Sequence, residues 1–413
     1  MPTVMTERYT AILGAFLVAL GPVSLALYTP AMPTLVDELA TSSAAIKLTI
    51  TAYFIGYALA QLACGPLSDA YGRRPIAIGF FSLHLVGSLI AIWSPSIGWL
   101  LAGRILQGTG AAAGVAISRA MVRDQFTGAA SVRIMSLIGL MLAVGPAFSP
   151  VLGGLTLSVF NWRSLFVLMA AYAAAAIGVL LFATRETNSQ PDPNMARPRQ
   201  FMASYKTLLT DRAFLRAGFL LALVTGGLYT LATLLPFVLI SEVGLSPIVF
   251  GLGMMLQSGS YALGSFLTAR FITYLGAERI ISIGLCFTFT ASLGFFIALF
   301  HEPSFLTVMV PVMFWAFGLA LTMPGATTSA LANFPRIAGA AAAMVGFLQI
   351  AGGLAGSAIS AFFADPYIAL MTIMPVMGLL AILVNFGLRS RSRTTVALQD
   401  GEREIRRLPD GPA

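Results

Sequence analysis

The stretch GPLSDAYGRRP, residues Gly65 to Pro75, decides how the rest of the chain is interpreted. It separates two long apolar runs, of which one ends near Cys64 and the next begins near Ile76. A turn this short between two apolar helices requires backbone angles that glycine adopts readily, and Gly72 lies within it. One acid and two adjacent arginines complete the stretch. By residue type alone it predicts a polar hairpin loop at a membrane surface, whose arginines fix the orientation of the chain.

The composition is that of a membrane protein. Of the 413 residues, 58% are hydrophobic and 10% are charged, and the mean hydropathy is +0.87, whereas a soluble domain carries about 25% charged residues. The net charge of +8 is typical of arginines in cytoplasmic loops, so no nucleic-acid partner is expected. Cys64 and Cys286 both lie in apolar runs, and we expect no disulfide framework, metal site or cofactor.

Twelve segments are long and apolar enough to cross a bilayer, which takes about 20 residues. We therefore predict an all-α membrane protein with twelve transmembrane helices in two six-helix halves. The first segment is interpreted as a retained helix, because no small-residue cleavage site follows it. The predicted spans are 9–29, 46–66, 76–94, 97–119, 134–156, 163–183, 214–236, 247–270, 279–299, 304–328, 338–362 and 367–388.

The longest polar stretch between the spans divides them six and six. It predicts an N-terminal half of residues 1–183, a cytoplasmic linker of residues 184–212, a C-terminal half of residues 213–388 and a cytoplasmic tail of residues 389–413. An internal repeat supports this division, because Gly264 to Arg279 follows the eighth span as the opening stretch follows the second. In that alignment Thr268 stands in the place of Asp69. Such halves are related by an axis along the membrane normal.

Positive charge is distributed unequally between the two sides. If the N-terminus lies inside, the inner loops and the tail carry most of the arginines, whereas the outer loops carry only Lys47 and Arg163. An excess of Lys and Arg marks the cytoplasmic side. Both termini are therefore predicted to be cytoplasmic.

The opening stretch resembles the loop signature between helices 2 and 3 of the major facilitator superfamily, with the pattern G-x-L-x-D-x-x-G-R-R. The resemblance implies a charge network in which an acid at the inner end of helix 4 joins the loop acid and arginine. We call this set the inner latch, which the resemblance implies holds the cytoplasmic side shut. The alternative is charge that serves topology only, although an acid adds nothing to orientation. The inner latch comprises Gly65, Asp69, Gly72, Arg73, Arg74 and Asp124.

Arg104 lies about seven residues into the fourth predicted span, in RILQGTGAAAG, with Gln107 one turn further on. An arginine facing lipid is costly, so Arg104 is predicted to face the protein interior or a water-filled cavity. The string is similar to the helix 4 motif of the superfamily, which implies a role for Arg104 in proton transfer. The alternative is an arginine that reaches the outer interface by snorkelling.

The fifth predicted span reads LIGLMLAVGPAFSPVLGG and contains Gly145, Pro146 and Gly153. It resembles the helix 5 motif that typifies antiporters, while the alternative is an ordinary proline kink in a membrane helix. The three motifs in order, together with TPAMPTL after helix 1, look most like the Bcr/CflA (bicyclomycin/chloramphenicol) type of twelve-helix drug:proton antiporter. The resemblance covers Ala11 to about Arg389.

One departure from that type concerns the coupling group. Relatives of this type often carry an acid late in helix 1, where this chain has Ala26, and no acid lies in the middle of any predicted span. A proton-coupled cycle requires a group that gains and loses a proton. The remaining candidates are Asp37, at the outer end of helix 1, and His84, near the middle of helix 3. A lone histidine in a span is more often a packed, hydrogen-bonded residue.

The missing acid also constrains the substrate. A cationic drug has no counter-ion in the cavity, so a neutral or weakly anionic amphiphile fits better, with Arg104 as the deep positive charge. Polar and aromatic residues at helical spacing are candidates for the cavity wall, although such stripes serve equally well to hold helices together. These candidates are Tyr28, Tyr53, Tyr57, Gln61, Tyr229, Thr233, Gln257 and Tyr261.

The sequence therefore predicts a secondary transporter of the bacterial inner membrane, monomeric by default, and not an enzyme. Its predicted activity is the export of small, mostly neutral amphiphilic compounds by alternating access in exchange for protons. Two alternatives within transport stay open, a dedicated metabolite exporter and an uncoupled facilitator of the same fold. No Gly-x-x-x-x-Gly-Lys loop indicates nucleotide binding.

Overall fold

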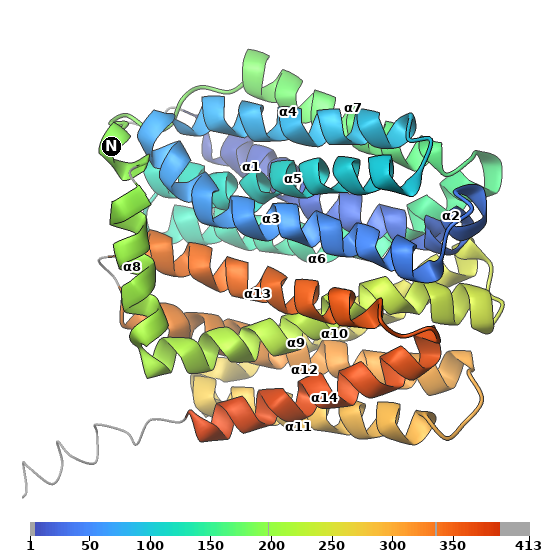
Figure 1. The fold of residues 1–413 in the computed structure, drawn as a ribbon. Helices are drawn as coiled ribbons and strands as arrows, with labels where there is room; N and C mark the ends of the chain where they lie inside the picture. Colours follow the sequence, from blue (N-terminus) through green and yellow to red (C-terminus); the bar gives the residue numbers. More distant parts are fainter. Residues whose placement is uncertain (1–4, 197, 335–336, 389–413) are drawn as a thin grey trace, which may run out of the picture.

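The computed structural model describes residues 5–196, 198–334 and 337–388, and in these ranges all regular structure is helical (Figure 1). The predicted tail of residues 389–413 lies outside the described residues. Each predicted span coincides with a helix whose ends differ from it by a few residues. Several of the long helices begin at a Ser, Thr or Asp whose side chain accepts a backbone N–H, as Ser42 and Ser246 do.

The helices form two packed groups. The first group contains α1 (Glu7–Tyr28), α2 (Met32–Glu38), α3 (Ser43–Tyr71), α4 (Arg73–Ile92), α5 (Ile97–Gln125), α6 (Gly128–Val159) and α7 (Arg163–Phe182). The second contains α9 (Arg212–Pro236), α10 (Pro247–Leu275), α11 (Ala277–Ala298), α12 (Phe305–Ala332), α13 (Ala338–Ser360) and α14 (Pro366–Gly387). Short segments η1 (Thr29–Ala31) and η3 (Phe237–Glu242) extend α1 and α9, and η2 (Pro193–Ala196) precedes α8 (Pro198–Thr210).

Packing within each group is repeated in the other. In the first group α5 lies between α3 and α4, and α1 packs on α6. In the second α12 packs on α10 and α11, and α9 packs on α13. The two groups meet along two long helix pairs, α3 with α13 and α6 with α10. Figure 1 shows the first group above the second.

The bundle has two ends, which we name the α8 end and the α2 end. The α8 end carries the beginning of α1, the α3–α4 turn and α8, which runs across both groups in Figure 1. The α2 end carries α2 and the end of α13. The helix α8 falls within the stretch predicted as a linker, where no helix was expected. Its Tyr205 hydroxyl donates to the Leu62 carbonyl, 2.9 Å away, so α8 is docked on the first group.

Eleven helices in the described part of the chain are long and apolar enough to cross a membrane. The protein is therefore a multi-pass membrane protein. Helix α10, which coincides with the eighth predicted span, has 29 residues but is not among the eleven. Its middle carries Gln257, Ser258 and Ser260, which lower its mean hydropathy. The number of twelve spans and the cytoplasmic position of both termini thus stay predictions.

The internal repeat is real in backbone geometry but shifted in register. Gly72 and Gly276 have matching dihedrals, with φ of 101° and 75° and ψ of 152° and 157°, and each ends one helix and begins the next. Glycine adopts such positive φ at little cost. Aligned on these glycines, Asp69 corresponds to Thr273, so the predicted equivalence of Thr268 was wrong. Thr268 lies in the interior of α10, where its hydroxyl donates to the carbonyls of Gly264 and Ala320.

Candidate functional site

Arg104 is the centre of a buried cluster in the first group of helices. Its side chain is fully buried, and the guanidinium carbon lies 4.6 Å from the centre of the Tyr28 ring and 4.4 Å from that of Tyr53. Each ring face attracts the cation. Its Nη1 donates to Oε1 of Gln107, 2.9 Å away. Arg104 therefore faces the protein interior and does not snorkel to the interface.

The two tyrosines that flank Arg104 are themselves fixed. The Tyr53 hydroxyl donates to the Gly21 carbonyl over 3.0 Å, and the Tyr28 hydroxyl lies 2.8 Å from Oγ1 of Thr49. These bonds connect α1 to α3 on both sides of the guanidinium. The position of the arginine is thus set by three helices, α1, α3 and α5, and any movement of α1 relative to α5 must change its surroundings.

Two donors of Arg104, Nε and Nη2, have no hydrogen-bond partner in the described residues. They form one edge of the guanidinium plane, the edge that binds a carboxylate or other paired acceptors. A buried charged donor without a partner is costly. Late in α1 this chain has Ala26, which brings no carboxylate. The cluster therefore holds an uncompensated positive charge with an unused binding edge.

A chain of hydrogen bonds leads from Arg104 to His84. Gln107 receives the guanidinium on Oε1 and donates through Nε2 to the Ser88 hydroxyl, 2.8 Å away, and Ser88 donates to the His84 carbonyl, 2.9 Å away. Nδ1 of His84 lies 2.8 Å from the Gln107 carbonyl, and Nε2 lies 3.2 Å from Oγ of Ser24. A carbonyl only accepts, so Nδ1 carries a proton and, in the neutral ring, Nε2 accepts from Ser24.

These hydrogen bonds connect three of the four predicted coupling residues, and the fourth lies elsewhere. Arg104, Gln107 and His84 belong to one buried cluster, whereas Asp37 is exposed on α2 at one end of the bundle. Ser24 and Ser88 complete the cluster and were not predicted. Nothing in the sequence singled them out, because serines are common in membrane helices. Ser24 lies next to His84 only because α1 packs on the rest of the group.

The predicted cavity residues fall into two sets. Tyr28, Tyr53 and Tyr57 are buried around the Arg104 cluster. Tyr229, from the second group, packs against Phe54 with ring centres 5.0 Å apart. The remaining predicted residues lie along helices of the boundary between the groups or of the second group, namely Gln61, Thr233, Gln257 and Tyr261.

Gln61 and Tyr261 have specific neighbours in this state. A Cβ added at Gly346 of α13 would lie 2.9 Å from Nε2 of Gln61, so Gln61 abuts the other group, and its Oε1 has no partner in the described residues. The Tyr261 hydroxyl donates to the sulfur of Met323 over 3.6 Å. Thr233 donates to its own helix, to the Tyr229 carbonyl. Gln61 is therefore the predicted cavity residue with an unused polar atom at the boundary.

The inner latch residues lie together at the α8 end. Arg73 is buried and forms ion pairs with both Asp69 and Asp124, with 2.9 Å between its Nε and Oδ2 of Asp124. Its Nη1 also donates to the Ser68 hydroxyl, 2.8 Å away. Arg74 points elsewhere and donates to the carbonyls of Leu180 and Leu181 at the end of α7. In the described part of the chain, no hydrogen bond or ion pair joins these side chains to the second group.

Glu186, which the sequence did not single out, anchors the predicted linker to the latch. Its carboxylate accepts the backbone N–H groups of Arg73 and Arg74, at 2.9 and 3.0 Å, and those of Thr187 and Asn188. The first two belong to the N-terminus of α4, where orphan donors and the helix dipole favour an anion. Thr187 Oγ1 donates to Oδ2 of Asp124 over 3.2 Å. The segment that follows α7 is therefore part of the latch structure.

Replacing Glu186 with alanine removes a helix-capping carboxylate. We expect the free energy of unfolding to fall by about 1–2 kcal/mol, as for the loss of a strong N-cap. The thermal midpoint of the purified protein in detergent measures the change. Glu302→Ala, at an exposed acid of the α11–α12 turn, is the matched control. An unchanged midpoint in Glu186→Ala alongside the control contradicts the capping role.

The predicted helix 5 motif lies in α6, which continues as one helix through Pro146 and Pro150. A Cβ added at Gly145 would contact Val23 at 3.1 Å, and one added at Gly153 would lie 2.5 Å from the Leu27 carbonyl. Both glycines therefore face α1. This places the motif against the helix that carries Tyr28 and Ser24.

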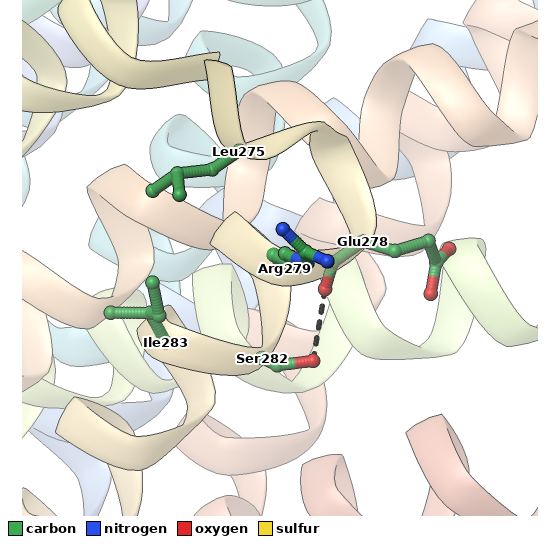
Figure 2. A pocket seen from close by; sticks show the side chains of 5 residues that line it. All are labelled: Leu275, Glu278, Arg279, Ser282 and Ile283. Atoms are coloured by element: carbon green, nitrogen blue, oxygen red, sulfur yellow. Dashed lines mark hydrogen bonds between the residues drawn. The ribbon is translucent and has the colours of Figure 1, made fainter. Parts of the chain in front are cut away.

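The second group has its own polar cluster at the α8 end. Arg216 donates to both carboxylate oxygens of Glu278 and to Oδ1 of Asn385, which joins α9, α11 and α14. Figure 2 shows a surface pocket beside it, lined by Leu275, Glu278, Arg279, Ser282 and Ile283. It contains none of the predicted site residues.

Known proteins resemble this chain over most of its length. A sequence model of the Major Facilitator Superfamily matches residues 13–356 and 217–410. The uncharacterized MFS-type transporter YdgK of Bacillus subtilis is 32% identical over 94% of this chain and 97% of its own. The bicyclomycin resistance protein homolog of Haemophilus influenzae is 26% identical (90% and 94%), and multidrug resistance protein D of Escherichia coli is 28% identical (91% and 94%).

A solved structure has the same fold. The crystal structure of the human organic anion transporter MFSD10 matches with a TM-score of 0.71 at 18% identity, over 93% of this chain and all of that chain. At this identity the match concerns the arrangement of the helices alone.

Proposed function

Because this chain belongs to the major facilitator superfamily and is a transporter rather than an enzyme, we propose that it exports small, mostly neutral amphiphilic compounds in exchange for protons. It is similar to transporters of the Bcr/CflA type, among them proteins named for resistance to bicyclomycin and to multiple drugs. Multidrug efflux across the bacterial inner membrane, by alternating access of the two helix groups, is the activity that fits these similarities best.

The observation that carries the proposed substrate class is the uncompensated charge of Arg104. In the described membrane helices the acids lie at helix ends, as Asp69, Asp124 and Glu242 do. A cationic compound entering beside the Arg104 cluster would meet a positive charge with no carboxylate to balance it. A neutral compound with carbonyl or nitro acceptors can instead use the free edge of the guanidinium.

His84 is the residue we propose for proton exchange. It is connected to Arg104 by a series of hydrogen bonds through Gln107 and Ser88. Binding of a compound at the guanidinium therefore alters the hydrogen bonds of the imidazole ring. Its Nε2 is the atom that takes the proton, because Nδ1 is already occupied by the bond to Gln107. The Ser24 hydroxyl of α1 faces that atom, and we propose that the proton reaches Nε2 through this hydroxyl.

The inner latch sets which side is accessible. We assign Asp69, Arg73 and Asp124 the role of holding the α8 end in place when the α2 end opens. The latch is formed within the first group while the α2 end is closed, so we propose that it holds the α3–α4 turn in the position from which that turn meets the second group when the α2 end opens. Its attachment to Glu186 extends this control to the segment that leads to the second group.

Transport into proteoliposomes with an imposed pH gradient tests the proposal. We expect the gradient to drive accumulation of chloramphenicol, a neutral probe, and not of a cationic dye measured in parallel. Movement of chloramphenicol that ignores the gradient would make the protein a facilitator. Failure of both probes, with efflux of a single metabolite instead, would make it a dedicated exporter.

A variant separates coupling from transport. His84→Asn keeps an N–H donor for the Gln107 carbonyl but cannot take a proton near neutral pH. Gradient-driven accumulation should be lost while downhill equilibration of chloramphenicol persists. Accumulation at the wild-type level in His84→Asn would exclude His84 as the proton carrier.

A further inference from the structure

Lys47 was predicted in an outer loop, but it lies buried at the boundary between the two helix groups. It lies near the start of α3, its side chain is 0% exposed, and Nζ donates to the carbonyls of Ser360 and Phe363 over 3.1 and 3.0 Å. These carbonyls are more than 300 residues away in sequence: Ser360 is the last residue of α13, and Phe363 lies in the turn that follows it. A buried ammonium is costly unless its donors are satisfied.

The C-terminal end of α13 is suited to hold that charge. The last carbonyls of a helix have no partner in their own helix and carry the negative end of its dipole. The ring of Phe237, in η3 of the second group, lies 5.9 Å from Nζ and adds a weak attraction. In the described residues Lys47 forms no salt bridge with a carboxylate, and its direct contacts with the second group are with two backbone carbonyls and one ring, while Asp365 and Glu242 of that group add a longer-range attraction.

The contact continues one turn deeper along the same helix pair. Oγ1 of Thr51 lies 2.9 Å from Oγ of Ser357, and the Ser357 hydroxyl also reaches the Lys47 carbonyl at 3.5 Å. The other helix pair is tight at this end too, because a Cβ added at Gly154 of α6 would lie 2.5 Å from the carbonyl of Pro247 of α10. The α2 end is therefore closed in this state.

We propose that Lys47 is the positioning residue that locks the α2 end closed during transport. The inference rests on the alternating-access part of the proposed function and is independent of the substrate. When the α2 end opens, α3 and α13 separate there and the ammonium leaves the α13 carbonyls for water. The lock and the inner latch then act at opposite ends of α3, one across the group boundary and one within the first group.

Distances between spin labels at each end test the lock. One label pair joins Thr41 to Ala364 across the α2 end, and the other joins Thr127 to Tyr274 across the α8 end, after Cys64→Ala and Cys286→Ser. Lys47→Met keeps the length of the side chain and removes its donors. We expect the ratio of open to closed populations at the α2 end to rise at least about tenfold, since the loss of one charge-assisted hydrogen bond accounts for that factor and Lys47→Met removes two.

The pair at the α8 end distinguishes a lock from general loosening. If Lys47 acts as a lock, that pair should shift toward shorter distances as the α2 pair shifts toward longer ones. Lys47→Arg, which still donates, should stay closed, and Lys206→Met, at the exposed lysine of α8, should behave as wild type. Unchanged populations in Lys47→Met, or broadening at both ends, would overturn the proposal, whereas failure of drug transport alone would leave it standing.

Discussion

Arg104→Ala should lower the rate of chloramphenicol transport by about 10- to 150-fold, which corresponds to the about 1.5–3 kcal/mol of a hydrogen bond to a charged group. The side chain is fully buried and is held between two tyrosine rings and Gln107. Its removal takes away the one strong positive charge of the buried cluster and leaves Oε1 of Gln107 without its donor. Initial rates in proteoliposomes, normalised to the amount of inserted protein, measure the loss.

Two further variants show whether the loss is due to the charge of Arg104 and whether it is specific to this arginine. Arg104→Lys keeps the positive charge but lacks the planar edge formed by Nε and Nη2. If the charge alone matters, this variant should retain part of the activity. Arg133→Ala removes an exposed arginine that pairs with Glu7, and it should transport normally. Wild-type transport by Arg104→Ala would mean that the buried cluster is structural.

The features that could be predicted from the sequence are those carried by residues close together along the chain. The GPLSDAYGRRP stretch, the Arg104–Gln107 pair and the α6 glycines and prolines each occupy a single segment, so their motifs survive without knowledge of packing. The helices were predictable for the same reason, because twenty apolar residues in a row suffice to define a span. The family followed from the order of these motifs.

The features that were missed depend on contacts between distant segments. Ser24 reaches His84 only because α1 packs across the first group, and Glu186 caps α4 only because α7 ends beside it. Lys47 looked like a loop charge because the sequence does not show that the end of α13 covers it. The repeat was aligned on the wrong glycine, since the shared element is the turn geometry at Gly72 and Gly276 rather than the letters around it.

Asp69 and Asp124, the two acids of the inner latch, differ in how deeply they are buried. The resemblance implied that both join Arg73 in one charge network, and in the structure both form an ion pair with it. The Asp69 side chain is 45% exposed, whereas that of Asp124 is 19% exposed, accepts from two nitrogens of Arg73 and also binds Thr187. Asp124 therefore supports the fold of this region, while Asp69 is free to respond to a change of state.

Asp69→Asn should consequently separate transport from stability. The Asp69 carboxylate is half exposed, and Arg73 keeps Asp124 and the Ser68 hydroxyl as partners, so the pair stabilises the fold by about 1 kcal/mol at most, and the thermal midpoint and the amount of inserted protein should stay close to wild type. Transport of chloramphenicol should still fall by up to about fivefold, because about 1 kcal/mol lost from one conformational state shifts the population that transport depends on by that factor.

The corresponding change at Asp124, the other acid of the latch, should have a different effect. Asp124→Asn removes the less exposed partner of Arg73 and should lower both the thermal midpoint and transport. Glu38→Gln, at an exposed acid of α2, should change neither. If Asp69→Asn transports at the wild-type rate, the latch role of Asp69 is wrong. If it loses stability as Asp124→Asn does, the two acids form one structural unit, and the switch between states must depend on other contacts.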